Sequence, residues 1–411
     1  MAPEFESPVS DAELLAPAAK TPGRVRVCVV TGTRAEYGLL RPVMKAIGSH
    51  AGLELAVVVT GMHLVGREPT HREVQAEFRV AGVVMMQRSG PAKGTWLTGT
   101  HASRIEDAEA LGRGVSGLAR TFYRLNVDLV LVLGDRIEAF AAASAASVGG
   151  IPLAHVHGGD VAEGVADEAM RHAISKLAHI HFPATRASAD RLLRLGEPQK
   201  RVFVVGSPAI DGLGAIAPMT DADAAALGDP AVVVLQHPCG LADDAERAWA
   251  RAVGEAAEAS GRRVLWMAPN HDAGREAVLE VLSATAERCG WSRRDHLPRD
   301  VFVALLKRLA ARGGVLAGNS SSGLIEASAL GVGVVNVGPR QAGRECVEAV
   351  RQVENPDAGR IRRAIDEASR SAQAAGRAHP FGDGLSGPRI AEVLAGVDLS
   401  DATLLRKRCT H

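Results

Sequence analysis

A group of charged and histidine side chains lies between Leu131 and His181, among apolar strand and helix patterns. Packing alone rarely gathers such groups at the ends of apolar strands, because each must lose its water and then find a polar partner. Carboxylates and imidazoles that lie together are the side chains that remove and return protons in enzymes. We therefore predict an enzyme that transfers protons, and this group consists of Asp135, Arg136, Glu138, His155, His157, Asp160, Asp167, Glu168, Arg171 and His172.

The helix predicted over residues 167–178 carries two polar pairs. Asp167 and Arg171 are four residues apart, as are Glu168 and His172, so each pair lies on one face of the helix. Surface ion pairs of this kind contribute only about 0.3–0.5 kcal/mol, which is the alternative explanation. The helix follows a glycine-rich turn, however, and this favours a position for its N-terminal end at a binding site.

Two histidines follow the neighbouring pattern. His155 and His157 are two residues apart on a predicted strand, so both rings should leave it on the same face. A histidine pair can bind a metal ion, but no third ligand follows at a suitable spacing, so we predict no metal site. Asp135 and Arg136 directly follow another apolar strand, where the alternative is an N-cap aspartate beside a solvated arginine.

Two strand-to-helix turns suit an anion. The turn TGTR and the loop GNSSSG each place backbone N–H groups at the start of a helix, where they can bind phosphate; an ordinary capped helix is the alternative. Neither turn has the GxGxxG pattern of dinucleotide sites or a Walker A lysine. Glu326, one turn into the second helix, could accept hydrogen bonds from sugar hydroxyls. The candidate ligand-binding residues in these turns and at other strand ends are Arg34, Ser320, Ser321, Ser322, Gly323, Glu326, His237 and Asn270.

The elements that must position these residues alternate between short β-branched runs and longer Ala/Leu/Glu/Arg-rich segments. This order is typical of parallel sheets flanked by helices, and we predict an α/β protein with two Rossmann-like domains and a cleft between them. We expect a flexible extension over 1–23, an N-terminal domain over 24–206, a C-terminal domain over 207–375 and a final helix and tail over 376–411. The predicted strands are Val25–Thr31, Glu54–Thr60, Leu129–Leu133, Pro152–His157, His179–Pro183, Val202–Val205, Ala231–Gln236, Arg263–Ala268, Gly314–Ala317 and Gly333–Val337.

Composition excludes several kinds of partner. Basic and acidic residues number 47 each, so no overall field attracts nucleic acid or an anionic membrane. Aromatic residues make up only 3%, which argues against a stacking surface for single-stranded nucleic acid. No apolar run approaches the roughly 20 residues that span a bilayer. The five cysteines are scattered without a CxxC pair, which favours a reducing cytoplasm over a disulfide framework.

The motifs taken together are more specific than any one of them. In order along the chain, TGTRAEYG, GDRxEAxAAA, HxHGGD, ADExxRHAISKLAHxHF, QHP, PNHDAG, GNSSSGLIEA and GPRQAGRE resemble the UDP-N-acetylglucosamine 2-epimerase family, over roughly residues 25 to 355. The similarity is greatest to its hydrolysing branch, which forms N-acetylmannosamine or related sugars. The resemblance implies a GT-B fold, a homo-oligomer (dimer or tetramer), a C-terminal helix that crosses back to the first domain, and no metal or redox cofactor.

The resemblance also implies a mechanism. A base removes the proton on C2 while UDP leaves, and water then adds to C1 of the glycal as C2 is reprotonated from the other face. By motif position, Asp135, Asp167 and His237 would be the acid–base groups and Arg171 would bind at the reacting centre. Glu168 and His157 would assist. The diphosphate would contact Arg34, Arg136, Asn270, the residues Ser320–Gly323 and Arg340, and the ribose would contact Glu326.

Several residues depart from the family pattern, and they bear on the substrate more than on the reaction. Glu36 stands where Asp is usual, Asp160 where Glu is usual, and Cys239, His271 and Arg275 also differ. Three alternatives therefore remain beside the hydrolysing epimerase. They are an epimerase of the same family that acts on a sugar phosphate or another nucleotide-linked sugar, a GT-B glycosyltransferase, and an inactive nucleotide-sugar sensor.

Overall fold

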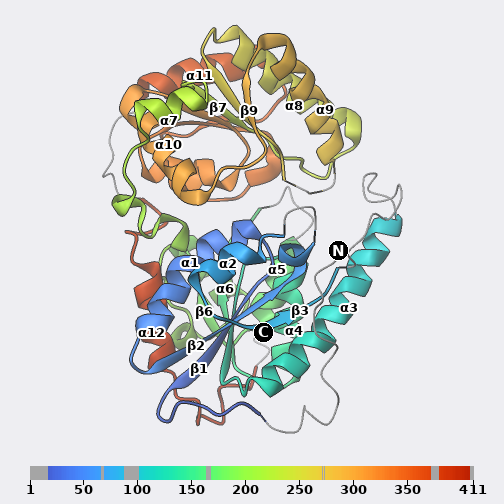
Figure 1. Cartoon of the computed structure of the whole chain (residues 1–411), viewed down its shortest axis with the longest axis vertical. Coiled ribbons are helices and arrows are strands. Elements are labelled where there is room, and N and C mark those ends of the chain that lie inside the picture. The colour runs from blue at the N-terminus through green and yellow to red at the C-terminus, as the bar shows by residue number, and fades with distance from the viewer. Residues whose placement is uncertain are drawn as a thin grey trace.

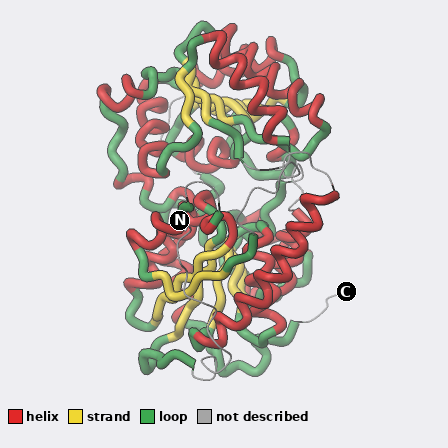
Figure 2. Tube along the Cα trace, turned by 45° about the vertical axis from the view of Figure 1, so that its right-hand side comes forward, coloured by secondary structure: helices red, strands yellow, loops and turns green. Residues whose placement is uncertain are grey.

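The computed structural model describes residues 17–65, 69–87, 101–162, 168–270, 272, 274–371 and 379–407. Two parallel sheets of six strands each lie one above the other along the long axis, and helices surround both (Figures 1 and 2). We call the part built on the first sheet the N-terminal half and the part built on the second the C-terminal half. The predicted class of two Rossmann-like units is confirmed, and the exact domain boundaries stay a prediction. Within the described ranges, no helix is both long and apolar enough to cross a membrane.

The N-terminal sheet has the strand order β3-β2-β1-β4-β5-β6. The order reverses between β1 and β4, and ligands of such sheets bind beyond the carboxyl ends of the strands at this switch point. The strands are β1 (Val25–Thr31), β2 (Leu53–Thr60), β3 (Val80–Val84), β4 (Leu129–Leu133), β5 (Leu153–Val156) and β6 (Ile180–Phe182). The helices are α1 (Arg34–Ser49), α2 (His71–Glu77), α3 (His101–Arg124), α4 (Ile137–Val148), α5 (Glu168–Leu177) and α6 (Arg186–Arg194).

The C-terminal sheet repeats this topology, with the order β12-β11-β10-β7-β8-β9 and a switch point between β7 and β10. Its apolar strands are buried on both faces, as parallel strands covered by helices must be. The strands are β7 (Val232–Leu235), β8 (Val264–Met267), β9 (Ser292–Arg294), β10 (Val315–Gly318), β11 (Gly333–Val337) and β12 (Arg351–Val353). The helices are α7 (Asp221–Ala226), α8 (Asp243–Ala259), α9 (Arg275–Cys289), α10 (Arg299–Arg312) and α11 (Ala358–Ser371), with a π-helical turn η6 at Gly323–Ala327.

The last helix, α12 (Ser386–Ala395), lies beside α1 in the N-terminal half (Figure 1). Ile390 and Leu394 are fully buried in the core of the N-terminal sheet. The Asp211 carboxylate accepts hydrogen bonds from the first two backbone N–H groups of α12, at 3.0 and 2.6 Å, and so caps the helix. Four residues before Asp211, Ser207 donates its backbone N–H to the Phe381 carbonyl at 2.7 Å. The segment around Ser207 and the segment around Phe381, which both join the halves, therefore run side by side.

Four predicted features of the fold need correction. Val202–Val205 is not a strand, because only Val202 forms a single bridge to His181. The edge strands β3, β9 and β12 were missed, since all three are short and partly exposed; β9 and β12 also lack an apolar run, and Gly82 interrupts β3. Among the other predicted strands, Val25–Thr31, Leu129–Leu133 and Gly333–Val337 are confirmed with the same bounds, and the rest differ from the observed strands by one residue at one or both ends.

The turn between β1 and α1 shows how the sequence TRAE starts a helix. The Thr33 hydroxyl accepts the Glu36 N–H at 3.3 Å, and the Glu36 carboxylate reaches back to accept the Gly32 N–H at 2.7 Å. This reciprocal pattern is close to a capping box. Burial raises the pKa of Glu36 to about 8; the hydrogen bond from Gly32 opposes the shift, and the nearby Glu138 carboxylate adds to it.

This burial predicts a pH-dependent stability. The folded chain holds the Glu36 proton more tightly than the unfolded chain, whose ordinary pKa is 4.5. The free energy of unfolding should therefore fall as the pH rises from about 4.5 to about 8, by about 1.4 kcal/mol per pKa unit. We expect Glu36→Gln, which keeps an acceptor for Gly32, to lose less stability than the wild type between pH 5 and pH 8 in urea unfolding. Glu287→Gln, on an exposed face of α9, is the control and should follow the wild type; equal losses in Glu36→Gln and wild type would refute this account.

Candidate active site between the two halves

A buried arginine organises the polar residues of the N-terminal half. Arg171, on α5, is 3% exposed, and its guanidinium is paired with the Asp135 carboxylate and lies 3.4 Å from Glu168. Asp135 follows β4, whereas Glu168 begins α5 and accepts the Ala162 N–H at 3.1 Å. The side chains of Asp135 and Glu168 are each 20% exposed, so both carboxylates can reach a ligand while Arg171 stays covered. The predicted pair between Glu168 and His172 is present, at 3.3 Å.

The buried ring of His155 contacts both segments that carry the Asp135–Arg171 pair. Its Nε2 contacts the Gly134 carbonyl at 2.8 Å, and its Nδ1 contacts the Ser175 hydroxyl at 3.2 Å. Burial lowers the pKa of His155 to about 3, so the ring is neutral at physiological pH. His155 thus ties the turn before Asp135 to helix α5, and we assign it a structural role.

The prediction that His157 lies on a strand is wrong, because β5 ends at Val156 and His157 is the next residue. Its backbone has a φ of +66°, which is rare for a residue with a side chain, so strand alternation does not govern where its ring points. The Nδ1 atom lies 3.0 Å from Asp160, and the Nε2 atom lies 3.0 Å from the Ser207 hydroxyl. Burial alone would raise the pKa of Asp160, but His157 and the arginines Arg344 and Arg171 outweigh it and hold the pKa below its usual range.

The C-terminal half contributes His237 at the end of β7. The backbone N–H of Asn270 donates to His237 Nδ1 at 3.0 Å, so the ring proton must sit on Nε2. Burial lowers the pKa of His237 to about 3, and Arg340 acts in the same direction. The fully buried Asn319, just after β10, bonds both the N–H and the carbonyl of His237 at 2.7 and 2.8 Å, and thereby joins the two strands at the switch point.

Asp272 connects the two halves. One of its oxygens lies 3.2 Å from Arg340 and accepts a hydrogen bond from Asn270, and the other lies 3.7 Å from Arg136 in the N-terminal half. Asp272 thus bridges Arg340 of the C-terminal half and Arg136, the residue that follows Asp135 in the N-terminal half.

Arg344 also reaches across. Its guanidinium donates to Gln341 at 2.9 Å and lies 3.9 Å from the Asp160 carboxylate. Burial lowers the pKa of Arg344, and the cations of Arg171 and Arg340 add to this effect. Among the described residues, no partner accepts a hydrogen bond from the Nε atoms of Arg171, Arg340 and Arg344. The Nε of Arg171 faces Glu168 at 3.4 Å, whereas Arg340 and Arg344 keep donors that are suited to binding an anion.

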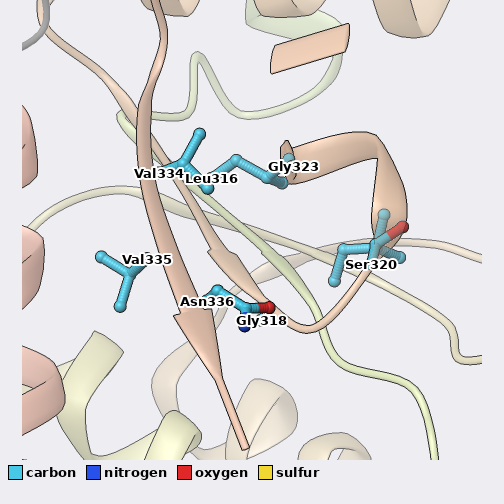
Figure 3. A pocket seen from close by; sticks show the side chains of 8 residues that line it. Leu316, Gly318, Ser320, Gly323, Val334, Val335 and Asn336 are labelled. Carbon is cyan, nitrogen blue, oxygen red and sulfur yellow. The ribbon is translucent and has the colours of Figure 1, made fainter. Parts of the chain in front are cut away.

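The serine loop lies at the carboxyl end of β10. Ser320 and Ser322 hydrogen-bond to each other at 2.9 Å, and Gly323 begins η6. Ser320 and Gly323 line one side of a small pocket whose other side chains are mainly apolar, among them Leu316, Val334 and Val335 (Figure 3). A Cβ at Gly323 would lie 3.2 Å from Val334, so we assign this pocket to packing beneath the loop.

The other predicted residues are placed as follows. Arg34 pairs with Glu73 on α2. Burial raises the pKa of Glu326, whereas Arg299, His157 and Arg344 oppose the rise, so its carboxylate lies near the contact between the halves. Asp167 lies outside the described residues. Within the described part of the chain, no three His, Cys, Asp or Glu side chains are arranged to hold a metal ion.

Sequence reasoning missed Asp272, Asn319 and Arg344 as site residues. All three stand inside motifs that were noted, namely PNHDAG, GNSSSG and GPRQAGRE. The available signal was their position just after strands β8, β10 and β11, where parallel sheets bind ligands. Nothing in the spacing of Arg344 indicated that it would meet Asp160 of the other half.

Comparisons with known proteins agree with this architecture. The chain is 36% identical over 336 residues to the hydrolysing UDP-N,N'-diacetylbacillosamine 2-epimerase of Legionella pneumophila, covering 80% of this chain and 85% of that protein. It is 30% identical over 334 residues to a UDP-N-acetylglucosamine 2-epimerase of Neisseria meningitidis, covering 79% and 82%.

The fold is also that of solved structures. The UDP-N-acetylglucosamine 2-epimerase of Methanocaldococcus jannaschii, in complex with UDP-GlcNAc and UDP, matches with a TM-score of 0.72 at 17% identity, covering 90% of this chain and 99% of that one. A family model described as UDP-N-acetylglucosamine 2-epimerase matches residues 45–395. The chain therefore belongs to the UDP-N-acetylglucosamine 2-epimerase family.

Proposed function

We propose that this protein is a hydrolysing 2-epimerase of a UDP-linked 2-acetamido sugar. The observation that supports this most is the pairing of Asp135 and Glu168 around the buried Arg171, opposite a second group of cations from the C-terminal half. Proton removal next to the anomeric carbon needs a carboxylate held at the sugar, and departure of a diphosphate needs cations nearby. Family membership supports the same reaction.

In this proposal a carboxylate, Asp135 or Asp167, takes the proton from C2. The electron pair of that bond forms the C1–C2 double bond as the C1–O bond breaks and UDP departs with both electrons of C1–O. The opposing acid then protonates the other face of C2, and water adds through its oxygen to C1. The proton that the water loses restores this acid, and the first carboxylate releases its proton to solvent. The net reaction consumes one water and yields UDP and the 2-epimeric free sugar.

The remaining residues hold the substrate. Arg171 orients Asp135 and Glu168, and His237 donates its Nε2–H without changing charge. Arg340 and the serine loop Ser320–Ser322 bind the diphosphate, and Glu326 accepts the ribose hydroxyls. Arg136 and Asn270 assist at the phosphates. Because Arg34 pairs with Glu73, it would have to exchange this partner in order to contact a ligand.

The sugar has two candidates. UDP-N-acetylglucosamine is named for the family model, and UDP-N,N'-diacetylbacillosamine is named for the relative at 36% identity. The departures Asp160 and Cys239 follow strands β5 and β7, and Glu36 lies in the first turn of α1; all three are compatible with a modified sugar. We further propose a homo-oligomer, a dimer or tetramer, in the reducing cytoplasm, which the scattered cysteines favour.

Proton NMR in deuterium oxide tests the reaction directly. With each of the two UDP-sugars, we expect one to give UDP and a manno-configured product that carries deuterium at C2. Epimerisation with UDP retained would contradict the hydrolytic step. If neither sugar exchanges its C2 proton, the nucleotide-sugar assignment is wrong, and hexose phosphates would be screened next.

The role of Asp135 predicts a large loss of rate. Asp135→Asn keeps the size of the side chain but removes the base and the charge that pairs with Arg171, so we expect kcat to fall by about 100-fold or more. Deuterium incorporation at C2 should fall in parallel. Asp190→Asn, on the exposed face of α6, is the control and should retain the wild-type rate. A fully active Asp135→Asn enzyme would remove Asp135 from the mechanism.

The low pKa of His237 predicts that this residue contributes no inflection to the pH profile of kcat/KM. Because burial lowers the pKa of His237 to about 3, its ring does not titrate between pH 5 and pH 9. We expect His237→Gln to lower kcat/KM about equally at every pH in this range and to leave the inflections of the profile in place. Loss of an inflection near pH 6–7 in the variant would show that His237 acts as a titrating base.

A further inference from the structure

We propose that Asp272 is a positioning residue, whose carboxylate ties the phosphate-binding residues of the C-terminal half to the turn that carries Asp135. This inference rests on the proposed function, because it assumes that the serine loop and Arg340 bind a diphosphate. It adds to that function a route by which occupancy of the phosphate site sets the position of the base.

A continuous series of contacts connects the serine loop of the C-terminal half with Arg136 in the N-terminal half. Ser320 adjoins Asn319, whose carbonyl accepts a hydrogen bond from Gln341 at 2.9 Å. The neighbouring Arg340 lies 3.2 Å from one oxygen of Asp272, and the other oxygen lies 3.7 Å from Arg136.

Arg136 is held on its other side as well. It is the N-cap residue of α4 and directly follows Asp135, and its Nε lies 3.6 Å from the buried carboxylate of Glu138. Glu138 is 1% exposed and fills the space beside Gly32 and Gly61, where a Cβ would collide with it. Glu138 thus fixes one end of the turn that carries Asp135, and the contact between Arg136 and Asp272 constrains the other side of the same turn.

The charge of Asp272 makes direct phosphate binding by this side chain unfavourable. Its side chain is 28% exposed, and Arg136 and Arg340 hold its pKa below the usual value although burial opposes this. It is therefore an anion placed beside the site of another anion. Its contribution must come from holding the two arginines, and this distinguishes it from a ligand-binding residue.

The test measures amide hydrogen exchange by mass spectrometry, with UDP as the probe. In the wild type we expect UDP to slow exchange both at the serine loop, residues 318–323, and at the Asp135 turn, residues 134–140. In Asp272→Asn, UDP should still protect the serine loop but no longer the Asp135 turn. The Kd for UDP should stay within about 3-fold of the wild-type value, because the carboxylate that is removed does not itself bind phosphate. The kcat should fall about 10-fold, because the Asp135 turn is no longer held in position.

Asp300→Asn is the matched control, because Asp300 also pairs across the halves, with Arg41 at 3.3 Å, but Arg41 lies on α1 and not on the turn that carries Asp135. It should behave as the wild type, and Asp272→Glu should restore part of kcat. If Asp272→Asn keeps UDP protection at the Asp135 turn, or if it loses UDP binding and kcat in equal measure, the inference is wrong. A wild type in which UDP protects neither segment overturns the proposed function itself.

Discussion

The buried guanidinium of Arg171 is the constraint on which the site depends. A buried charge without partners is very costly, so this arginine requires carboxylates around it. They come from three different segments: Asp135 after β4, Asp160 after β5 and Glu168 at the start of α5. Burial by itself would lower the pKa of Arg171, but these three carboxylates more than offset it. The demand for charge balance thus fixes how three successive turns of the N-terminal half lie relative to one another.

Arginine–carboxylate contacts join the halves, together with an apolar contact in which Leu39 on α1 packs against the cores of both halves. An exposed pair such as Arg41–Asp300 contributes little to holding the halves together, whereas Arg344 and Asp160 are buried and are costly to separate. The same contacts carry the chemistry, because Asp272 and Asp160 each face an arginine of the other half. The pairs across the halves are Arg136–Asp272, Arg344–Asp160, Arg191–Glu345 and Arg41–Asp300, at 3.7, 3.9, 2.7 and 3.3 Å.

Sequence patterns predicted the two sheets and the grouping of Asp135, Glu168 and Arg171, because strand ends and helix periodicity are local properties. They failed for the short edge strands β9 and β12, which carry little apolar signal, and for β3, an apolar run of only five residues that contains a glycine. They also misplaced His157, since a left-handed backbone after β5 leaves no trace in residue spacing. Contacts between the halves, such as Arg344 with Asp160, depend on how two domains dock, and no pattern within one domain encodes that.

The paired crossing of the chain between the halves has a mechanical consequence. Where Ser207 bonds to Phe381, two segments pass between the halves side by side, and the Asp211 carboxylate pins the start of α12 next to them. A single strand would let the halves twist freely about it, whereas a two-stranded ribbon is stiff within its own plane and bends only across it. The paired crossing therefore restricts rotation of one half about the other more than a single connecting segment would.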